Sequence, residues 1–248
     1  MPDDDGSLVW RPNGGFKVTP PAEYPPEEGR FLRGNDLSPV AVCAVLKWPD
    51  DAIPPGIEQL VRIGIETGAA LAGTLQTENI GIEKMICNIV ANPNIRYLVV
   101  CGPESPGHLV GQTLNALVLN GVGEDRRIIG SEALTPYLYN IPSSAIERFR
   151  QQIRIIDLLD EGDPMLVRDA VWSCYQEQPT RFRDYELFDP GAFQDEPICS
   201  SLTLRVRQPW YAPRTSEEAT ALDRMHALMA EIKAKRDAIR AAKEQEQE

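Results

Sequence analysis

His108 offers the clearest chemistry in the chain, and it is one of only two histidines among 248 residues. It follows an apolar run of strand length, residues 95–101, and a loop rich in glycine and proline, residues 102–107. Ligands of open α/β sheets bind just beyond the carboxyl ends of the strands, and imidazole is the commonest metal ligand among side chains. His108 is therefore a candidate ligand-binding residue. The alternative is a structural histidine that is hydrogen-bonded within its loop.

The sequence around His108 limits the kind of metal site that it could build. No second histidine, aspartate or cysteine stands three or four residues away, and Glu104 is the one acid nearby. A metal cage made by protein side chains alone needs about four ligands. A metal held by His108 should therefore bring most of its own ligands, as a macrocycle does.

Small residues beside His108 are suited to a large planar ligand. Gly102 and Gly107 remove side-chain bulk where such a ligand would approach the backbone. Gly111 and Gln112 follow one helical turn later. We expect these four residues to line the same crevice as His108.

Two further loops are candidates for this crevice. Thr77, Glu78 and Asn79 follow an apolar strand-like run, and they either cap the next helix or present hydrogen-bonding groups to a ligand. The loop at residues 137–142 is bracketed by prolines, and its Asn140 could serve either the turn or a ligand. Both interpretations stay open for both loops.

Several other classes of function find no support in the sequence. There is no GxGxxG fingerprint, no Walker lysine motif and no GxSxG elbow. The formal net charge of −12 argues against nucleic acid as a partner. The five cysteines are odd in number and form no CxxC pair, which predicts free thiols in a reducing compartment and no catalytic cysteine. His226 lies in a charged segment and is expected at the surface.

The alternation of apolar strand-like runs with amphipathic segments predicts the elements that position these loops. Runs at residues 40–46, 95–101 and 153–159 alternate with helical patterns such as residues 81–91, where apolar side chains recur at i, i+3, i+4 and i+7. We expect an α/β fold with a mostly parallel sheet flanked by helices.

Composition divides the chain into four predicted regions. Residues 1–37 form an extended arm rich in proline and acid, partly disordered; residues 38–160 form the ligand-binding domain; and residues 161–213 form an extension packed on it. Residues 214–248 form a charged amphipathic helix, which either lies on its own domain or docks onto a partner or a second copy. Without a signal peptide or a membrane-spanning run, a cytoplasmic protein is expected.

Eight blocks of residues, in one order and at one spacing, carry a family resemblance over residues 38–160. The chain resembles the A subunit of tetrahydromethanopterin:coenzyme M methyltransferase, which is the corrinoid-carrying subunit of a membrane complex of methanogens. The blocks are Ser38–Val42, Thr77–Met85, Asn92–Leu98, Cys101–Gly102, Gly107–His108, Gly111–Gln112, Arg127–Gly130 and Asn140–Pro142.

The resemblance implies a Rossmann-like domain that binds a cobamide such as cobalamin, with His108 as the axial ligand of cobalt. In such a family the cobalt takes a methyl group from a methyl-tetrahydropterin and passes it to a thiol, together with partner methyltransferase subunits. The cofactor-binding residues implied here are His108, Thr77, Glu78, Asn79, Gly102, Gly107, Gly111, Gln112, Asn140, Ile141 and Pro142. The charged end of the chain, where the family has a hydrophobic anchor, predicts a soluble homologue.

Three functions remain to be distinguished. The first is a corrinoid methyl carrier, with catalysis either by this chain or by a separate methyltransferase. The second is a non-catalytic binding or assembly module that acts through the C-terminal helix. The third is a nucleotide or folate binder that uses the same crevice, although the chain has no phosphate-binding glycine fingerprint.

Overall fold

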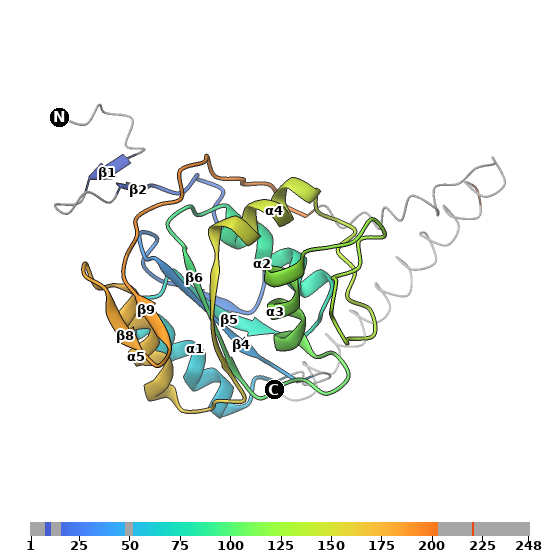
Figure 1. Ribbon diagram of the computed structural model, residues 1–248, viewed down its shortest axis with the longest axis horizontal. Helices are drawn as coiled ribbons and strands as arrows, with labels where there is room; N and C mark the ends of the chain where they lie inside the picture. Colours follow the sequence, from blue (N-terminus) through green and yellow to red (C-terminus); the bar gives the residue numbers. More distant parts are fainter. Residues whose placement is uncertain (1–7, 11–15, 48–51, 203–219, 221–248) are drawn as a thin grey trace, which may run out of the picture. The chain divides into compact units, whose positions relative to one another are not determined.

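The computed structural model describes residues 8–10, 16–47, 52–202 and 220 (Figure 1). The described residues from 8 to 202 belong to one compact unit. Its strands are β1 (Leu8–Trp10), β2 (Phe16–Val18), β3 (Phe31–Arg33), β4 (Val40–Val45), β5 (Leu71–Leu75), β6 (Tyr97–Gly102), β7 (Arg154–Leu159), β8 (Thr180–Phe182) and β9 (Tyr185–Leu187). Its helices are α1 (Pro55–Thr67), α2 (Ile80–Val90), α3 (Val110–Asn120), α4 (Ser143–Gln152) and α5 (Pro164–Cys174).

A five-stranded sheet in the order β3-β5-β4-β6-β7 forms the centre of this unit, with β3 antiparallel and the other four strands parallel. All six residues of β4 and all six of β6 are buried. Continuous burial is expected for parallel strands because helices cover both faces of the sheet. The predicted α/β fold with a mostly parallel, helix-flanked sheet is confirmed.

Alternate residues of the central strands supply two separate cores. Cys43 and Val100 face the core formed with α2, α3 and α4. Val42 and Val99 face the core formed with α1 and α5. This alternation follows from the two-residue period of a strand, and Figure 1 shows the helices on the two sides of the sheet.

The predicted arm contributes directly to this unit. Its residues 31–33 form β3, which pairs with β5 and closes one edge of the sheet. Lys17 is 1% exposed and lies 2.7 Å from the buried carboxylate of Asp189. The backbone of Glu27 exchanges two hydrogen bonds with the Asn88 side chain of α2, at 2.8 and 3.1 Å. Residues 16–37 of the arm are therefore anchored to the rest of the unit.

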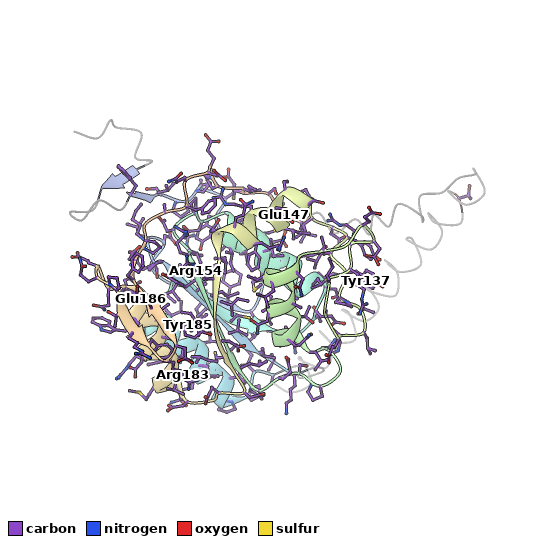
Figure 2. All side chains as sticks on the ribbon, viewed as in Figure 1. Tyr137, Glu147, Arg154, Arg183, Tyr185 and Glu186 are labelled. Carbon is purple, nitrogen blue, oxygen red and sulfur yellow. The ribbon has the colours of Figure 1, made fainter. Side chains whose placement is uncertain are left out.

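The predicted extension also contributes to the core. Helix α5 buries Val167, Ala170 and Val171 against the sheet. The β8–β9 hairpin lies beside β7, where the Tyr185 hydroxyl accepts a hydrogen bond from the backbone N–H of Asp157 at 3.0 Å (Figure 2). The predicted helix at residues 214–248 lies outside the described residues, apart from one position. Among the described residues, no helix combines the length and apolarity needed to cross a bilayer.

Candidate functional site

The order of the strands brings Glu78 and His108 together. Strands β5 and β6 lie on either side of β4, and both lead into helices on the same face of the sheet. The loops that leave their carboxyl ends therefore meet above β4 on that face. His108 Nδ1 lies 2.6 Å from Glu78 Oε2. The Glu78 side chain is only 1% exposed, whereas that of His108 is 30% exposed.

Thr135 extends this contact to a three-residue chain. Glu78 Oε1 accepts hydrogen bonds from the Thr135 hydroxyl at 2.7 Å and from the Thr135 backbone N–H at 3.1 Å. Burial disfavours the charged form of Glu78, but the hydrogen bonds from Thr135 and His108 outweigh it, so the pKa of Glu78 lies below its ordinary value. An ionised carboxylate can only accept, so His108 Nδ1 donates to Glu78, and in this tautomer Nε2 is the ring nitrogen that can carry a lone pair.

Glu104 shapes the loop that carries His108. One of its carboxylate oxygens accepts from the backbone N–H of Ser105 at 2.8 Å and of Gly111 at 3.1 Å, and the other accepts from Gln112 at 2.8 Å. A carboxylate at the first turn of α3 is favoured by the unpaired N–H groups and by the helix dipole. Glu104 therefore folds the loop over the start of α3.

The structure shows Thr77 and Asn79 in the capping role, one of the two interpretations of residues 77–79. The Thr77 hydroxyl accepts from the Gly81 N–H at 3.0 Å, and Asn79 Oδ1 accepts from the Ile80 N–H at 2.7 Å, so both side chains cap α2. Asn79 Nδ2 also donates to the Thr135 hydroxyl at 3.3 Å. The capping residues thus share the segment at Thr135 with Glu78.

Two of the predicted glycines have surroundings that favour glycine. Gly102 has a φ of +83°, and its backbone exchanges hydrogen bonds of 2.8 Å with Asp160 and Glu161 after β7. A Cβ on Gly111 would lie 2.4 Å from Leu159 Cδ1, so a larger residue there would require the Leu159 side chain to move. Both glycines therefore have a structural reason that does not depend on a ligand.

Gly107 and Gln112 have different surroundings from those two glycines. Gly107 has a φ of +83°, yet a Cβ there would meet no atom within 4 Å. The space beside the loop at this point is open. The Gln112 side chain donates to the Gly130 carbonyl at 2.9 Å and accepts from the Glu132 N–H at 3.2 Å. It thereby ties α3 to the segment that carries Thr135.

The third predicted loop is fixed by charged side chains. Asn140 donates from its backbone N–H and from Nδ2 to the two carboxylate oxygens of Glu83, at 2.6 and 2.7 Å. Burial raises the pKa of Glu83, and the hydrogen bonds from Asn140 oppose this effect. Ile141 is buried and its carbonyl accepts from Arg126, and Pro142 immediately precedes α4. Asn140 therefore holds this loop against α2.

The cysteines take no part in the site as reactive groups. All five are free thiols, and four of them are buried. Burial raises the pKa of Cys87 and of Cys101 to about 12, so both stay protonated near neutral pH. Within the described residues, no group of three or more His, Cys, Asp or Glu side chains could hold a metal ion.

Two features of this site were not found from the sequence. Glu104 is the acid closest to His108 along the chain, but its carboxylate caps α3, and the acid that contacts the imidazole is Glu78, thirty residues earlier. Thr135 was not identified at all. It lies in a stretch without periodicity, and only the tertiary structure places it at Glu78.

Most of this chain is similar in sequence to known proteins. The family model that describes the A subunit of tetrahydromethanopterin S-methyltransferase matches residues 17–205. Two A subunits of this enzyme from Methanothermobacter marburgensis, numbered 2 and 1, are each 40% identical, over 179 and 181 residues; these spans cover 72% and 73% of this chain and 85% and 67% of the relatives. The A subunit from Methanococcus maripaludis is 36% identical over 187 residues, 75% of this chain and 70% of its own length. The chain belongs to the family of A subunits of tetrahydromethanopterin S-methyltransferase.

Proposed function

We propose that this chain is a corrinoid-binding methyl carrier in which Nε2 of His108 is the axial ligand of the cobalt in a cobamide. The observation that carries the proposal is the 2.6 Å hydrogen bond between His108 Nδ1 and the buried carboxylate of Glu78. Relatives named as S-methyltransferases of tetrahydromethanopterin support a methyl-tetrahydropterin as donor and a thiol as acceptor. The partners would be other methyltransferase subunits.

The donor set fits a cobamide for two reasons. Histidines that ligate metals almost always donate their second ring N–H to a carboxylate, a carbonyl or water, which fixes the tautomer and the orientation of the ring. The described residues offer one such imidazole and no cluster of three ligating side chains. A corrin ring brings four equatorial nitrogens, so a single protein imidazole is the contribution that it requires.

In this proposal the cobamide supplies the cobalt centre that takes up and releases the methyl group. Glu78 holds the proton on His108 Nδ1, and its negative charge makes Nε2 a stronger donor. Thr135 donates both of its hydrogen bonds to Glu78 Oε1, and these bonds hold the other carboxylate oxygen toward His108. Glu104 holds the loop on which His108 stands.

The test is reconstitution of the full-length chain with hydroxocobalamin, followed by reduction to Co(II) and electron paramagnetic resonance of protein labelled with 15N-histidine. A histidine ligand gives a doublet splitting from 15N, whereas the cofactor's own base gives a triplet from 14N. We expect the doublet in the wild type and its loss in His108→Ala. His226→Ala, the other histidine of the chain, is the matched control and should keep the doublet.

A triplet in the wild type, or a doublet that persists in His108→Ala, contradicts the assignment of His108 as the ligand. Absence of any tight corrinoid binding contradicts the carrier function as a whole. In that case the second hypothesis, an assembly module without cofactor chemistry, would be the better account of the chain.

A further inference from the structure

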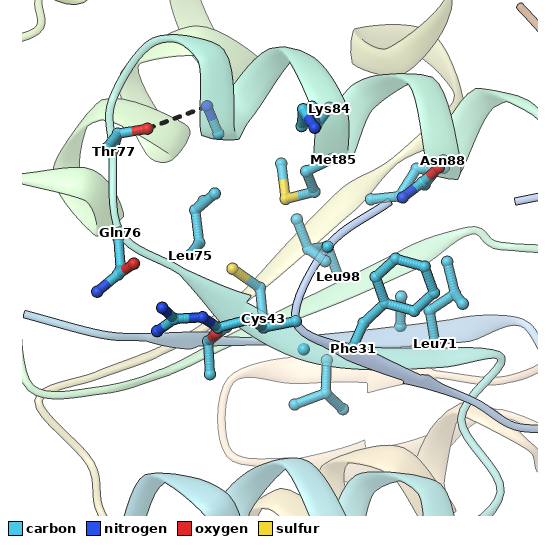
Figure 3. Close-up of a pocket in the computed structure, with 18 of the residues that line it drawn as sticks. Phe31, Cys43, Leu71, Leu75, Gln76, Thr77, Lys84, Met85, Asn88 and Leu98 are labelled. Carbon is cyan, nitrogen blue, oxygen red and sulfur yellow. Dashed lines mark hydrogen bonds between the residues drawn. The ribbon is translucent and has the colours of Figure 1, made fainter. Parts of the chain in front are cut away.

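An open cavity of about 680 Å³ lies at the end of the sheet away from His108. Its volume is within the range of small-molecule sites, about 300 to 1,000 Å³. It differs in this position from the cavity between α2 and the sheet, whose lining includes Gln76 and Thr77 and therefore adjoins Glu78 and the candidate functional site (Figure 3).

Three segments of the chain meet at the open cavity. Helices α1 and α5 lie on one face of the sheet, and each begins after the carboxyl end of a parallel strand (Figure 1). Thr67 and Gly68 stand at the end of α1, just before β5, and Trp172 and Tyr175 stand at the end of α5. Asn35, which precedes β4, completes this part of the wall. The lining thus gathers at the amino ends of the strands and shares no residue with the candidate functional site.

Two aromatic side chains form the apolar part of the wall. Trp172 is 62% exposed, so one face of a large indole ring is open to a ligand. Tyr175 is held close to the end of α1, because a Cβ on Gly68 would lie 2.8 Å from the Tyr175 hydroxyl oxygen. This hydroxyl accepts a hydrogen bond from Asn35 Nδ2 at 3.4 Å. The faces of tryptophan and tyrosine rings attract cations.

Polar side chains of the lining use their hydrogens within the protein. The Thr67 hydroxyl donates to a carbonyl one helical turn earlier at 2.7 Å, and the Thr180 hydroxyl donates to the Gln178 carbonyl at 3.3 Å. Gln176 Nε2 donates to the Trp172 carbonyl at 2.9 Å. What these three side chains have left for a ligand is mainly the lone pairs of their oxygen atoms. They therefore favour a ligand that donates hydrogen bonds.

The charge of the lining favours a cation as well. Among the described residues that line the cavity, Glu177 is the one acid, and there is no lysine, arginine or histidine. The chain as a whole has a formal net charge of −12, which raises the concentration of cations at its surface. A guanidinium is planar, weakly hydrated and able to stack on an aromatic face, whereas an ammonium is compact and strongly hydrated. An open aromatic wall therefore suits a guanidinium better.

From these observations we propose that the cavity binds a guanidinium group, which stacks on Trp172 and donates its N–H groups to oxygen atoms of the lining, Gln176 Oε1 among them. Two sources carry this group. One is a small guanidino compound, and the other is an arginine side chain of another protein. Neither source involves the cofactor of the proposed function.

Tryptophan fluorine signals provide a direct readout in the full-length chain. Protein labelled with 5-fluorotryptophan is titrated with N-butylguanidinium, with N-butylurea, which is a planar neutral analogue, and with butylammonium. The 19F signal that is missing from Trp172→Phe identifies that of Trp172. We expect N-butylguanidinium to shift this signal, and each of the two controls to bind about tenfold more weakly. If no probe shifts it at millimolar concentration, or if N-butylurea binds as well as N-butylguanidinium, the proposal is overturned.

Variants at exposed positions test the location and the charge. Trp172→Ala should abolish saturation transfer to N-butylguanidinium, and Leu119→Ala, at a 76% exposed position of α3 on the other face of the sheet, should keep it. Glu177→Gln should weaken N-butylguanidinium about fivefold without affecting N-butylurea, and Glu124→Gln, which removes the same charge elsewhere on the surface, is its matched control. Equal binding by Trp172→Ala and the wild type would contradict the site.

Two further titrations identify the source and separate this site from the cofactor assignment. Binding of Nα-acetyl-L-arginine N-methylamide as tightly as N-butylguanidinium shows that an arginine within a protein chain fits the cavity. Binding of N-butylguanidinium alone assigns the cavity to a small compound. In His108→Ala the Trp172 signal should shift as in the wild type, and loss of that shift would contradict a cavity separate from the candidate functional site.

Discussion

Replacing Glu78 by glutamine tests the His108–Glu78–Thr135 chain most directly. The Glu78 side chain is 1% exposed, so water screens little of its charge. Its carboxylate accepts one hydrogen bond from His108 and two from Thr135. Hydrogen bonds to charged groups contribute about 1.5–3 kcal/mol, and neutral ones about 0.5–1.5 kcal/mol. Glutamine can keep the Thr135 bonds only in neutral form, and it presents an N–H to His108, which itself donates.

The expected cost follows from these bonds. Weakening two bonds to Thr135 costs about 1 kcal/mol each, and loss of the bond to His108 adds a similar amount. Relief from burying a charge offsets part of this, so we expect Glu78→Gln to lower the free energy of unfolding by about 2 kcal/mol at pH 7. For a chain of this size that corresponds to a Tm lower by about 4–8 °C.

The pH dependence separates this explanation from simple misfitting of glutamine. The pKa of Glu78 is lowered in the folded state, so its stabilising effect is present above the ordinary value of 4.5 and is lost as the pH falls through the folded pKa. Urea unfolding of the wild type and Glu78→Gln should therefore differ by about 2 kcal/mol at pH 7 and converge below pH 4.5.

Glu132→Gln is the control for removal of a negative charge near this segment. Glu132 is exposed and stands three residues before Thr135, so its replacement should change stability by less than about 0.5 kcal/mol. A Glu78→Gln variant as stable as this control at pH 7 would refute the reasoning. A stability difference that stays constant from pH 7 to pH 3.5 would refute the ionised state assigned to Glu78.

Three further outcomes are expected. Lys17→Met should cost about 3–5 kcal/mol in urea unfolding because the buried carboxylate of Asp189 loses its cation; adding Asp189→Leu should restore most of that loss. Phe149→Ala should cost about 3–5 kcal/mol in the same assay because Phe149 is fully buried in the core between α4 and the sheet. Since burial raises the pKa of Glu83, the wild type should lose stability relative to Glu83→Gln as the pH rises through 4.5, a trend that urea midpoints at pH 4 and pH 7 would reveal.

Strands β4 and β6 of the central sheet could be predicted from the sequence because their burial is continuous. Residues 40–45 and 97–102 are apolar throughout, and a strand covered on both faces needs no alternation. The loops after β5 and β6 were likewise identified as the site, because polar residues there follow buried runs. His108 and Glu78 were both named on this basis.

The contacts between these residues could not be predicted in the same way. Glu78 meets His108 only because β5 and β6 flank β4, and this strand order has no local signature. Thr135 lies in a segment whose position depends on Gln112 and Glu78 rather than on its own pattern. The arm has a composition typical of disorder, yet Lys17 is buried, and its partner Asp189 stands 172 residues later in the chain, where no local pattern connects the two.

The attachment of the arm has a consequence for synthesis on the ribosome. Lys17 pairs with Asp189, the Phe16 carbonyl accepts from the Ala192 N–H, and the Glu27 carboxylate accepts from the Leu202 N–H. Residues 16–27 therefore wait for residues 189–202 to leave the exit tunnel. The parallel strands can pair before that point, but this part of the arm can be fastened only after those later residues have emerged. A nascent chain halted before Asp189 should thus expose its arm to protease while the sheet is already protected.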